Sequence, residues 1–389
     1  MNRRSGSLGA EISLTELEDD LHPALARLRE SEPVSWLPAL KGWLVTRYDL
    51  ALEVMRDDDT FTVDDPRFST AQVIGPSMLS LDGAEHDCHR QPFVAPFRPG
   101  PVRDLFGDAV AAETNRLLDE LAPAGRAELR RSFAGPLAAA TITRALGLGE
   151  TAVAAVLAWY DAIVSAVNEI TAGHGLPVAG REAFGQLRAA LETAIESGGT
   201  SLLGAAAGDS ALTHDQLASS AAVLLFGGIE TTEGMICNSV LELLERPVMV
   251  AQVREHPALV NAAIEESLRL EPAAAVVDRY ATVDVALAGA KIAAGDLVRV
   301  SITAANRDPA VFANPDDFKL DRDHSRRHLA FAQGPHVCLG IHLARLEART
   351  ALKTLLQRFP NLRLDPDRPS RIHGLVFRKP PELNAVWDA

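Results

Sequence analysis

Cysteine is scarce in this sequence of 389 residues, which contains only Cys88, Cys237 and Cys338. Three cysteines so far apart cannot build a disulfide framework, and Cys88 and Cys237 are best explained as structural side chains. Long apolar runs are also lacking, because no segment reaches the roughly 18 uninterrupted apolar residues of a transmembrane helix. We therefore expect neither a disulfide-rich scaffold nor a membrane protein, and Cys338 needs an explanation of its own.

Positive charge is in deficit as well: 38 Lys and Arg stand against 52 Asp and Glu, a formal net charge of −14. Nucleic-acid-binding proteins neutralise phosphates with a surplus of Lys and Arg, so we expect no nucleic-acid partner. The first 20 residues contain arginines but no apolar core of a secretion signal. These absences predict a soluble, cytoplasmic protein.

The fold class follows from the hydrophobic periodicity. Helical periodicity dominates residues 103–246 and returns from about 338 to 359, while strand-like runs occupy 33–37, 42–47 and much of 276–302. We expect a mainly α fold with smaller β-sheets (α+β), in a single domain over residues 1–389. Glycines between 164 and 208 are compatible with ordinary helix connections, which we favour, or with a mobile lid.

Cys338 lies in FAQGPHVCLG (331–340), just before the last helical segment. Backbone N–H groups at a helix start favour a thiolate there. Gly334 and Gly340 would let a flat, bulky group approach the backbone, and Phe331 could shield the sulfur from water. Zinc is a poor alternative because a structural site wants about four Cys or His ligands. A nucleophilic cysteine with His336 as its base would lack a third orienting group.

This loop resembles the haem-ligand loop of the cytochrome P450 family. The residues that match are Phe331, Gly334, His336, Cys338 and Gly340. The family commonly has glycine where Ala332 stands, and a left-handed backbone at that position would cost an alanine about 1 kcal/mol. The resemblance implies haem b bound through the thiolate of Cys338.

A second match lies in the middle of a helix predicted from a capping box at Thr213 and Gln216 to a stop before Pro247. GGIETT (227–232) combines weak helix formers with an ionisable group. It indicates either a kinked core helix with a satisfied glutamate or an interrupted turn with room for dioxygen. The motif fits the family's oxygen-activating helix. The likeness implies that Gly228, Glu230 and Thr231 are catalytic, with Thr231, solvent and Glu230 delivering protons.

Further matches extend the resemblance to most of the chain. Glu266 and Arg269 have the spacing of the family's buried Glu-x-x-Arg pair, and Arg322 is the candidate third member; taken alone, such a pair is usually exposed and nearly neutral in stability. The family also binds the haem propionates with cations. The corresponding residues here are His86, Arg90, Arg279 and His336.

The resemblance to soluble bacterial members also predicts partners. With no flavin or nicotinamide domain of its own, the chain should receive electrons from NAD(P)H through a ferredoxin reductase and a ferredoxin, with O2 as co-substrate. We expect ferredoxin to bind a basic surface, although each arginine could simply be solvated. Its residues would be Arg98, Arg103, Arg326, Arg327 and Arg345.

The expected activity is insertion of one oxygen atom into a moderately sized, largely hydrophobic small molecule by a monomeric enzyme. The pocket residues implied by family position are mostly apolar, though they could be plain core. They are Met78, Leu79, Leu225, Gly228, Ala274, Ala275, Val277, Val376 and Phe377. Two alternatives remain open: a haem-thiolate sensor without turnover and a peroxide-driven peroxygenase. The Glu230/Thr231 pair argues against both.

Overall fold

The computed structural model describes residues 7–149, 151–171, 174–198, 201–209 and 211–388. The chain divides into two compact units that are each built from segments far apart in the sequence. Unit 1 comprises Met1–Val63, Gly234–Cys338 and Phe359–Trp387, and unit 2 comprises Asp64–Glu233, Leu339–Arg358 and Asp388–Ala389. Of the glycines predicted to connect helices between 164 and 208, Gly173 and Gly199 lie outside the described residues.

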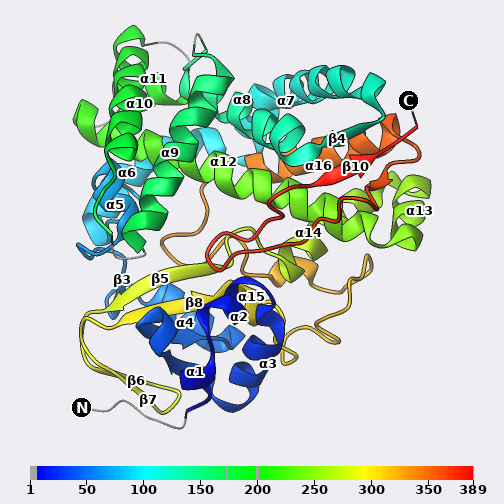
Figure 1. The fold of residues 1–389 in the computed structure, drawn as a ribbon. Coiled ribbons are helices and arrows are strands. Elements are labelled where there is room, and N and C mark those ends of the chain that lie inside the picture. Colours follow the sequence, from blue (N-terminus) through cyan, green and yellow to red (C-terminus); the bar gives the residue numbers. More distant parts are fainter. Residues whose placement is uncertain (1–6, 150, 172–173, 199–200, 210, 389) are drawn as a thin grey trace. The chain divides into compact units, whose positions relative to one another are not determined.

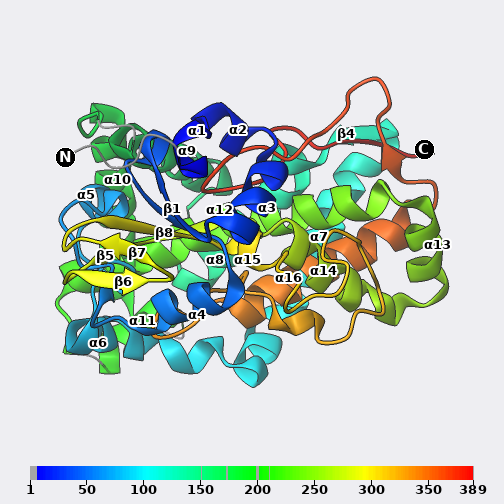
Figure 2. The same ribbon diagram turned by 90° about the horizontal axis from the view of Figure 1, so that it is seen from below.

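Unit 1 contains a five-stranded sheet in the order β1-β2-β8-β5-β3. Its strands are β1 (Val34–Leu37), β2 (Gly42–Val45), β8 (Leu297–Ser301), β5 (Val276–Ala281) and β3 (Phe61–Thr62). The predicted strands at 33–47 form an antiparallel pair, with Trp36 opposite Trp43. β2 runs parallel to β8, and β5 runs antiparallel to β8, beside which it is seen in Figure 2. The strand predictions for 276–302 are thus confirmed.

An apolar core covers one face of this sheet. Alternate residues such as Val298 and Val300 of β8 are fully buried and pack with Val45, Val54 and Phe61. Helix α4 (Tyr48–Arg56) lies against β8 and α15 (Ile302–Ala305). A strand buried on one face needs this alternation of apolar side chains, and it fixes the register of β8 against β5.

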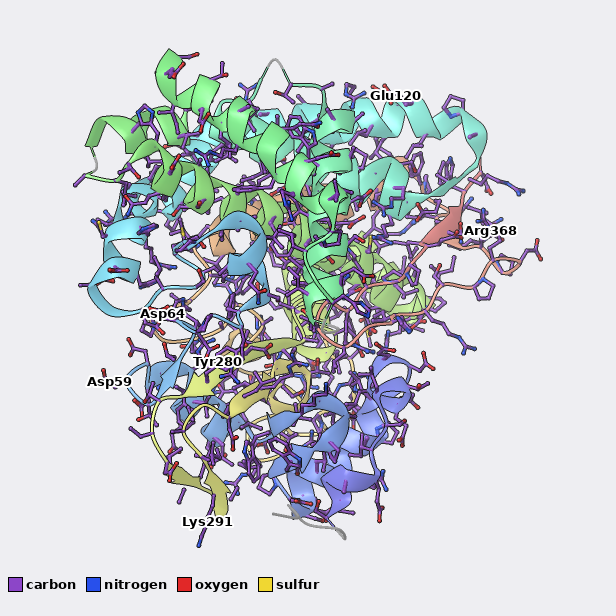
Figure 3. The ribbon with its side chains drawn as sticks, turned by 60° about the vertical axis from the view of Figure 1, so that its left-hand side comes forward. Asp59, Asp64, Glu120, Tyr280, Lys291 and Arg368 are labelled. Carbon is purple, nitrogen blue, oxygen red and sulfur yellow. The ribbon has the colours of Figure 1, made fainter. Side chains whose placement is uncertain are left out.

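Unit 1 contains further helices and strands outside this sheet. They are α1 (Leu8–Glu11), α2 (Leu14–Glu18), α3 (Leu21–Ser31), α13 (Pro247–Glu255), α14 (Val260–Leu270), the hairpin β6 (Val285–Leu287) and β7 (Ala290–Ile292), and the pair β9 (Arg363–Leu364) and β10 (Asn384–Val386). Figure 3 shows Tyr280 on β5 and Lys291 on the β6–β7 hairpin.

Unit 2 is almost entirely helical, as predicted for residues 103–246. Its elements are α5 (Ser69–Ile74), α6 (Gly83–Val94), α7 (Pro99–Leu121), β4 (Arg126–Glu128), α8 (Gly135–Leu146), α9 (Val153–Thr171), α10 (Val178–Ser197), α11 (Leu202–Asp209), the long helix α12 as far as Glu233, and α16 (Ile341–Arg358). α16 packs along α7, and α9 packs against α8 and α10 (Figure 1). The mainly α class with smaller sheets is confirmed.

Two predicted helices differ in detail from the structure. α12 spans His214–Leu244. Its predicted capping box is present, since the Gln216 N–H donates to Thr213 Oγ1 at 3.3 Å and the Thr213 N–H donates to Gln216 Oε1 at 2.9 Å. Of the two alternatives for residues 227–232, the interrupted turn is not found, because α12 is helical throughout. The last helix begins at Ile341 rather than at Cys338.

Among the described residues, only helix α9 is long and apolar enough to cross a membrane, judged by length and composition alone. It carries a buried stripe, Val156, Tyr160, Ile163 and Val167, at helical spacing. Because α9 packs against α8 and α10, this stripe marks it as a packed helix of unit 2.

A buried acid lies between two other helices of unit 2. Glu347 of α16 is buried, and its Oε2 has no hydrogen-bond partner. Burial raises the pKa of Glu347 well above its ordinary value, while a hydrogen bond with Thr141 of α8 acts weakly in the opposite direction. The Thr141 hydroxyl already donates to the Leu137 carbonyl at 2.9 Å. Burial outweighs this hydrogen bond, so the neutral carboxyl of Glu347 is favoured.

Candidate functional site

The Cys338 loop is closed by backbone hydrogen bonds within unit 1. The Cys338 N–H donates to the Phe331 carbonyl at 2.9 Å, and the Val337 N–H donates to the Gly334 carbonyl at 3.1 Å. These bonds make a compact loop whose end carries the sulfur. Residues 331–340 are all partly buried.

Two residues of this loop have a left-handed backbone. Gly334 has φ of +77°, and a Cβ there would clash with the carbonyl oxygen of Met55, near the end of α4. Ala332 has φ of +57°. The position where the family commonly has glycine therefore does need a left-handed residue, so the alanine carries the expected strain.

A buried histidine supports the approach to the loop. His328 Nε2 donates to Glu265 of α14 at 3.1 Å, and the Ala330 N–H donates to His328 Nδ1 at 3.2 Å. The second bond assigns the proton to Nε2. The Leu329 N–H donates to Asn306 Oδ1 at 2.7 Å. Sequence reasoning missed these contacts, because they join residues far apart in the sequence.

The Glu266 network has all three predicted members. Glu266 and Arg269 are 0% exposed and are joined by two hydrogen bonds, at 2.9 and 2.8 Å. Arg322 Nε donates to Glu266 Oε1 at 2.7 Å. Arg269 also donates to the carbonyls of Asn306 and Pro315, at 3.1 and 2.5 Å. Asn306 also accepts the Leu329 N–H, so this one residue links the Glu266 network to the segment just before the Cys338 loop.

The cations predicted for haem propionates fall into two pairs. In unit 1, Arg279 is buried in β5, paired with Val298 of β8, and His336 lies in the Cys338 loop. Arg279 Nη1 donates to the Asp278 carbonyl at 2.8 Å. In unit 2, His86 and Arg90 lie one turn apart on α6, and His86 is buried.

This set of donors fits haem. A thiol in a closed loop offers an iron ligand, and the left-handed Gly334 lets that loop pack closely against the end of α4. A buried guanidinium on an apolar sheet face suits a carboxylate partner such as a propionate. Within the described residues, no group of three or more His, Cys, Asp and Glu side chains could hold a metal ion.

The GGIETT motif lies within the unit 2 part of α12. Glu230 is buried and accepts a hydrogen bond from the hydroxyl of Tyr160 on α9. Thr231 Oγ1 donates to the Gly227 carbonyl at 2.8 Å. The glutamate is therefore satisfied, as one of the two alternatives predicted. Tyr160 was missed because a tyrosine in an amphipathic stripe is typical of ordinary core.

The two glycines of the motif have different surroundings. A Cβ on Gly228 would lie 3.1 Å from Cγ1 of Ile142, so this glycine lets α8 pack closely on α12. A Cβ on Gly227 would meet nothing within 4 Å. Gly228 is therefore packed against Ile142, and the room for dioxygen beside the motif stays a prediction.

The predicted pocket residues are divided between the units. In unit 1, Ala274 pairs with Phe377 in a β-bridge, and the Ala275 N–H donates to the Val376 carbonyl at 2.9 Å. Val277 packs against the core of the sheet, which favours the plain-core alternative for this residue. In unit 2, Met78 and Leu225 are buried and Leu79 is partly buried.

The arginines predicted to bind a ferredoxin are also divided. Arg98 and Arg103, at the start of α7, are exposed, and Arg103 Nε lies 2.8 Å from Asp104 Oδ1. Arg345 on α16 is partly buried. These three belong to unit 2, whereas the exposed Arg326 and Arg327 belong to unit 1. Burial and the charge of Arg345 lower the pKa of His342, so this histidine adds little positive charge at neutral pH.

Comparisons with known proteins agree with the motifs. The family described as Cytochrome P450 matches residues 187–385. The chain is 35% identical to Nocardicin C N-oxygenase of Nocardia uniformis subsp. tsuyamanensis, over 99% of this chain and 98% of that protein. It is 34% identical to Cytochrome P450 monooxygenase PikC of Streptomyces venezuelae, over 92% of this chain and 88% of that protein.

A solved structure extends the similarity to the fold. P450BioI, in complex with an acyl carrier protein ligated to hexadec-9Z-enoic acid, superimposes with a TM-score of 0.85 and 29% identity, covering 95% of this chain and 99% of that one. The family match to residues 187–385 includes the Cys338 loop, the Glu266 network and the GGIETT motif. The chain therefore belongs to the cytochrome P450 family and is a P450 monooxygenase.

Proposed function

We propose that this monooxygenase inserts one oxygen atom of O2 into a moderately sized, largely hydrophobic small molecule, with two electrons from a separate ferredoxin. The observation that carries the proposal is the Cys338 loop, closed by the Cys338–Phe331 hydrogen bond and left-handed at Gly334. Such a loop can hold the Cys338 sulfur in a fixed place as a thiolate ligand for iron. The proposal includes a monomeric enzyme, a single catalytic domain and a cytoplasmic location.

The residues that would hold haem b have separable tasks. Cys338 would bind the iron as a thiolate, and the propionates would be neutralised by Arg279, His336, His86 and Arg90. When bound in this way, haem supplies the cleavage of the O–O bond, which thiolate donation favours. The protein itself must orient the substrate, limit water and deliver protons.

Proton delivery is assigned to Thr231 and Glu230. The Thr231 hydroxyl hydrogen points to the Gly227 carbonyl, and rotation about χ1 would release it for donation elsewhere. Glu230 is a buried carboxyl group that can take up a proton from solvent and pass it on to the Thr231 oxygen. A sensor without turnover has no need of this pair, and a peroxide-driven enzyme does not need its proton supply.

The substrate class rests on apolar residues and on the relatives. One small apolar group in unit 1 consists of Ala274, Ala275, Val376 and Phe377. The predicted pocket residues of unit 2, also apolar, are Met78, Leu79 and Leu225. Relatives are named for the oxygenation of nocardicin C and of mycinamicin IV. These names support a role in tailoring a secondary metabolite.

Electron supply is assigned to NAD(P)H, a ferredoxin reductase and an acidic ferredoxin. Exposed arginines on an acidic protein would attract such a partner at low ionic strength. Arg98, Arg326 and Arg327 are exposed. Reversing their charge should slow reduction at low salt and leave substrate binding unchanged.

The test is reconstitution with haem and a carbon-monoxide difference spectrum of the reduced protein. The thiolate spectrum should be lost in Cys338→Ala and retained in the matched variants Cys88→Ala and Cys237→Ala. Product should then form only with NADH, reductase and ferredoxin. Product formed with peroxide alone would support the peroxygenase alternative, and ligand binding without any product would support the sensor.

A further inference from the structure

Tyr160 is a buried tyrosine that contacts the single acid of the GGIETT motif. It is 2% exposed on α9, and Glu230 is 3% exposed on α12. The Tyr160 hydroxyl donates a hydrogen bond to Glu230 Oε2. The Tyr160 ring also lies 6.5 Å, between centroids, from the ring of Phe226. Phe226 and Glu230 are four residues apart, so Tyr160 contacts two successive turns on one face of α12.

This contact satisfies a group that is costly to bury. A carboxylate removed from water is unfavourable unless it accepts hydrogen bonds, and bonds to an ionised acceptor are about twice as strong as neutral ones. Tyr160 belongs to the buried stripe of α9 that includes Val156 and Ile163. Because its ring is held by packing, the hydroxyl is presented to Glu230 from a fixed direction.

The contact also sets the direction of Glu230 relative to Thr231. Consecutive residues of an α-helix are about 100° apart around its axis. Glu230 faces α9, while the Thr231 hydroxyl donates to the Gly227 carbonyl on its own helix. An ionised Glu230 must first take up a proton from solvent before it can pass one toward Thr231, and it does so from the orientation that Tyr160 imposes.

We propose that Tyr160 is a positioning residue that holds the carboxylate of Glu230 for proton delivery. This inference rests on the proposed monooxygenase function. It predicts that the effect of Tyr160 on turnover passes through Glu230 alone, and a double-mutant cycle can isolate that dependence.

The experiment compares wild type, Tyr160→Phe, Glu230→Gln and the double variant as haem-loaded full chains with reductase and ferredoxin. The quantity measured is hydrogen peroxide released per NADH oxidised, with hexadec-9Z-enoic acid as the probe. Tyr160→Phe should raise peroxide release roughly fivefold, as expected for the loss of one hydrogen bond. The double variant should match Glu230→Gln, because Tyr160 has nothing left to position.

The matched control is Tyr48→Phe. The Tyr48 hydroxyl donates to the Arg327 carbonyl at 2.7 Å, so this variant also loses a tyrosine hydrogen bond but has no contact with Glu230. It should lower the midpoint of urea unfolding and leave peroxide release unchanged. The urea midpoint is also measured for wild type, Tyr160→Phe, Glu230→Gln and the double variant. If the Tyr160–Glu230 bond stabilises the protein, the effects of the two single substitutions on this midpoint should not add up to that of the double variant.

The outcomes separate the inference from the proposed function. If Tyr160→Phe releases no more peroxide than wild type, or if the two single effects simply add, the positioning role is refuted. A wild type that returns nearly all its electrons as peroxide also refutes it. If wild type oxidises no NADH with any partner or probe, the proposed function fails, and an additive unfolding cycle would then refute the contact itself.

Discussion

Replacing Glu266 by glutamine should destabilise the protein by about 3–5 kcal/mol, the usual cost of breaking a buried ion pair. Glu266 accepts hydrogen bonds from Arg269, from Arg322 Nε at 2.7 Å and from the Lys319 N–H at 3.0 Å. Glutamine keeps the shape but removes the charge and turns one acceptor oxygen into a donor. Two buried guanidinium groups then lose their shared carboxylate. A typical domain has only about 5–15 kcal/mol of stability, so the loss should be large.

The assay is urea unfolding of the haem-free protein, followed by circular dichroism at fixed pH. The control is Glu120→Gln, which breaks the Arg116–Glu120 pair of 2.6 Å on the surface of α7 (Figure 3). Because Glu120 is 63% exposed, this change should cost under about 0.5 kcal/mol. A loss below about 1 kcal/mol for Glu266→Gln would show that the network contributes little, and the reasoning from burial would be wrong.

Three further predictions concern the site and its supports. Thr231→Ala should raise peroxide release per NADH at least about tenfold, whereas Thr231→Ser, which keeps a hydroxyl, should stay near wild type. Ala332→Gly should raise the free energy of unfolding by about 1 kcal/mol because it relieves the left-handed backbone, and the control Ala330→Gly should not. The raised pKa of Glu347 contributes stability that is fully present below pH 4.5 and is lost as the pH rises toward the folded pKa. The free energy of unfolding, measured by urea titration, should therefore fall less from about pH 5 to about pH 8 in Glu347→Gln than in wild type. Equal falls in the two proteins would contradict a neutral buried Glu347.

Local patterns predicted the elements well because their physical causes are local. The capping box at Thr213 and the paired strands at 33–47 depend on residues that are close in sequence. The Cys338 loop was recognisable for the same reason. The sequence predicts strain at Ala332 if its backbone is left-handed, and its φ of +57° shows that it is.

The misses share a different cause, since each depends on contacts between distant segments. Tyr160 reaches Glu230, and His328 reaches Glu265, across separations that no spacing rule covers. The predicted interruption of α12 relied on the weak helix propensity of Gly and Thr. Tertiary packing outweighs that weakness, because α8 presses Ile142 against Gly228 and the helix continues.

The register of β5 against β8 decides which sign of charge β5 shows on each side of the sheet. Arg279 lies opposite Val298, while Asp278 lies opposite Arg299 and pairs with it at 2.6 Å. Neighbouring residues of a strand point to opposite faces, so a slip by one position would exchange guanidinium for carboxylate on the apolar face. The hydrogen-bonded register of β5 and β8 thus decides whether a positive or a negative side chain lies on the apolar face. The register of the backbone is therefore an all-or-none choice between a face that attracts an anion and one that repels it. Substitutions that loosen the strand ends should not produce intermediates between these two registers.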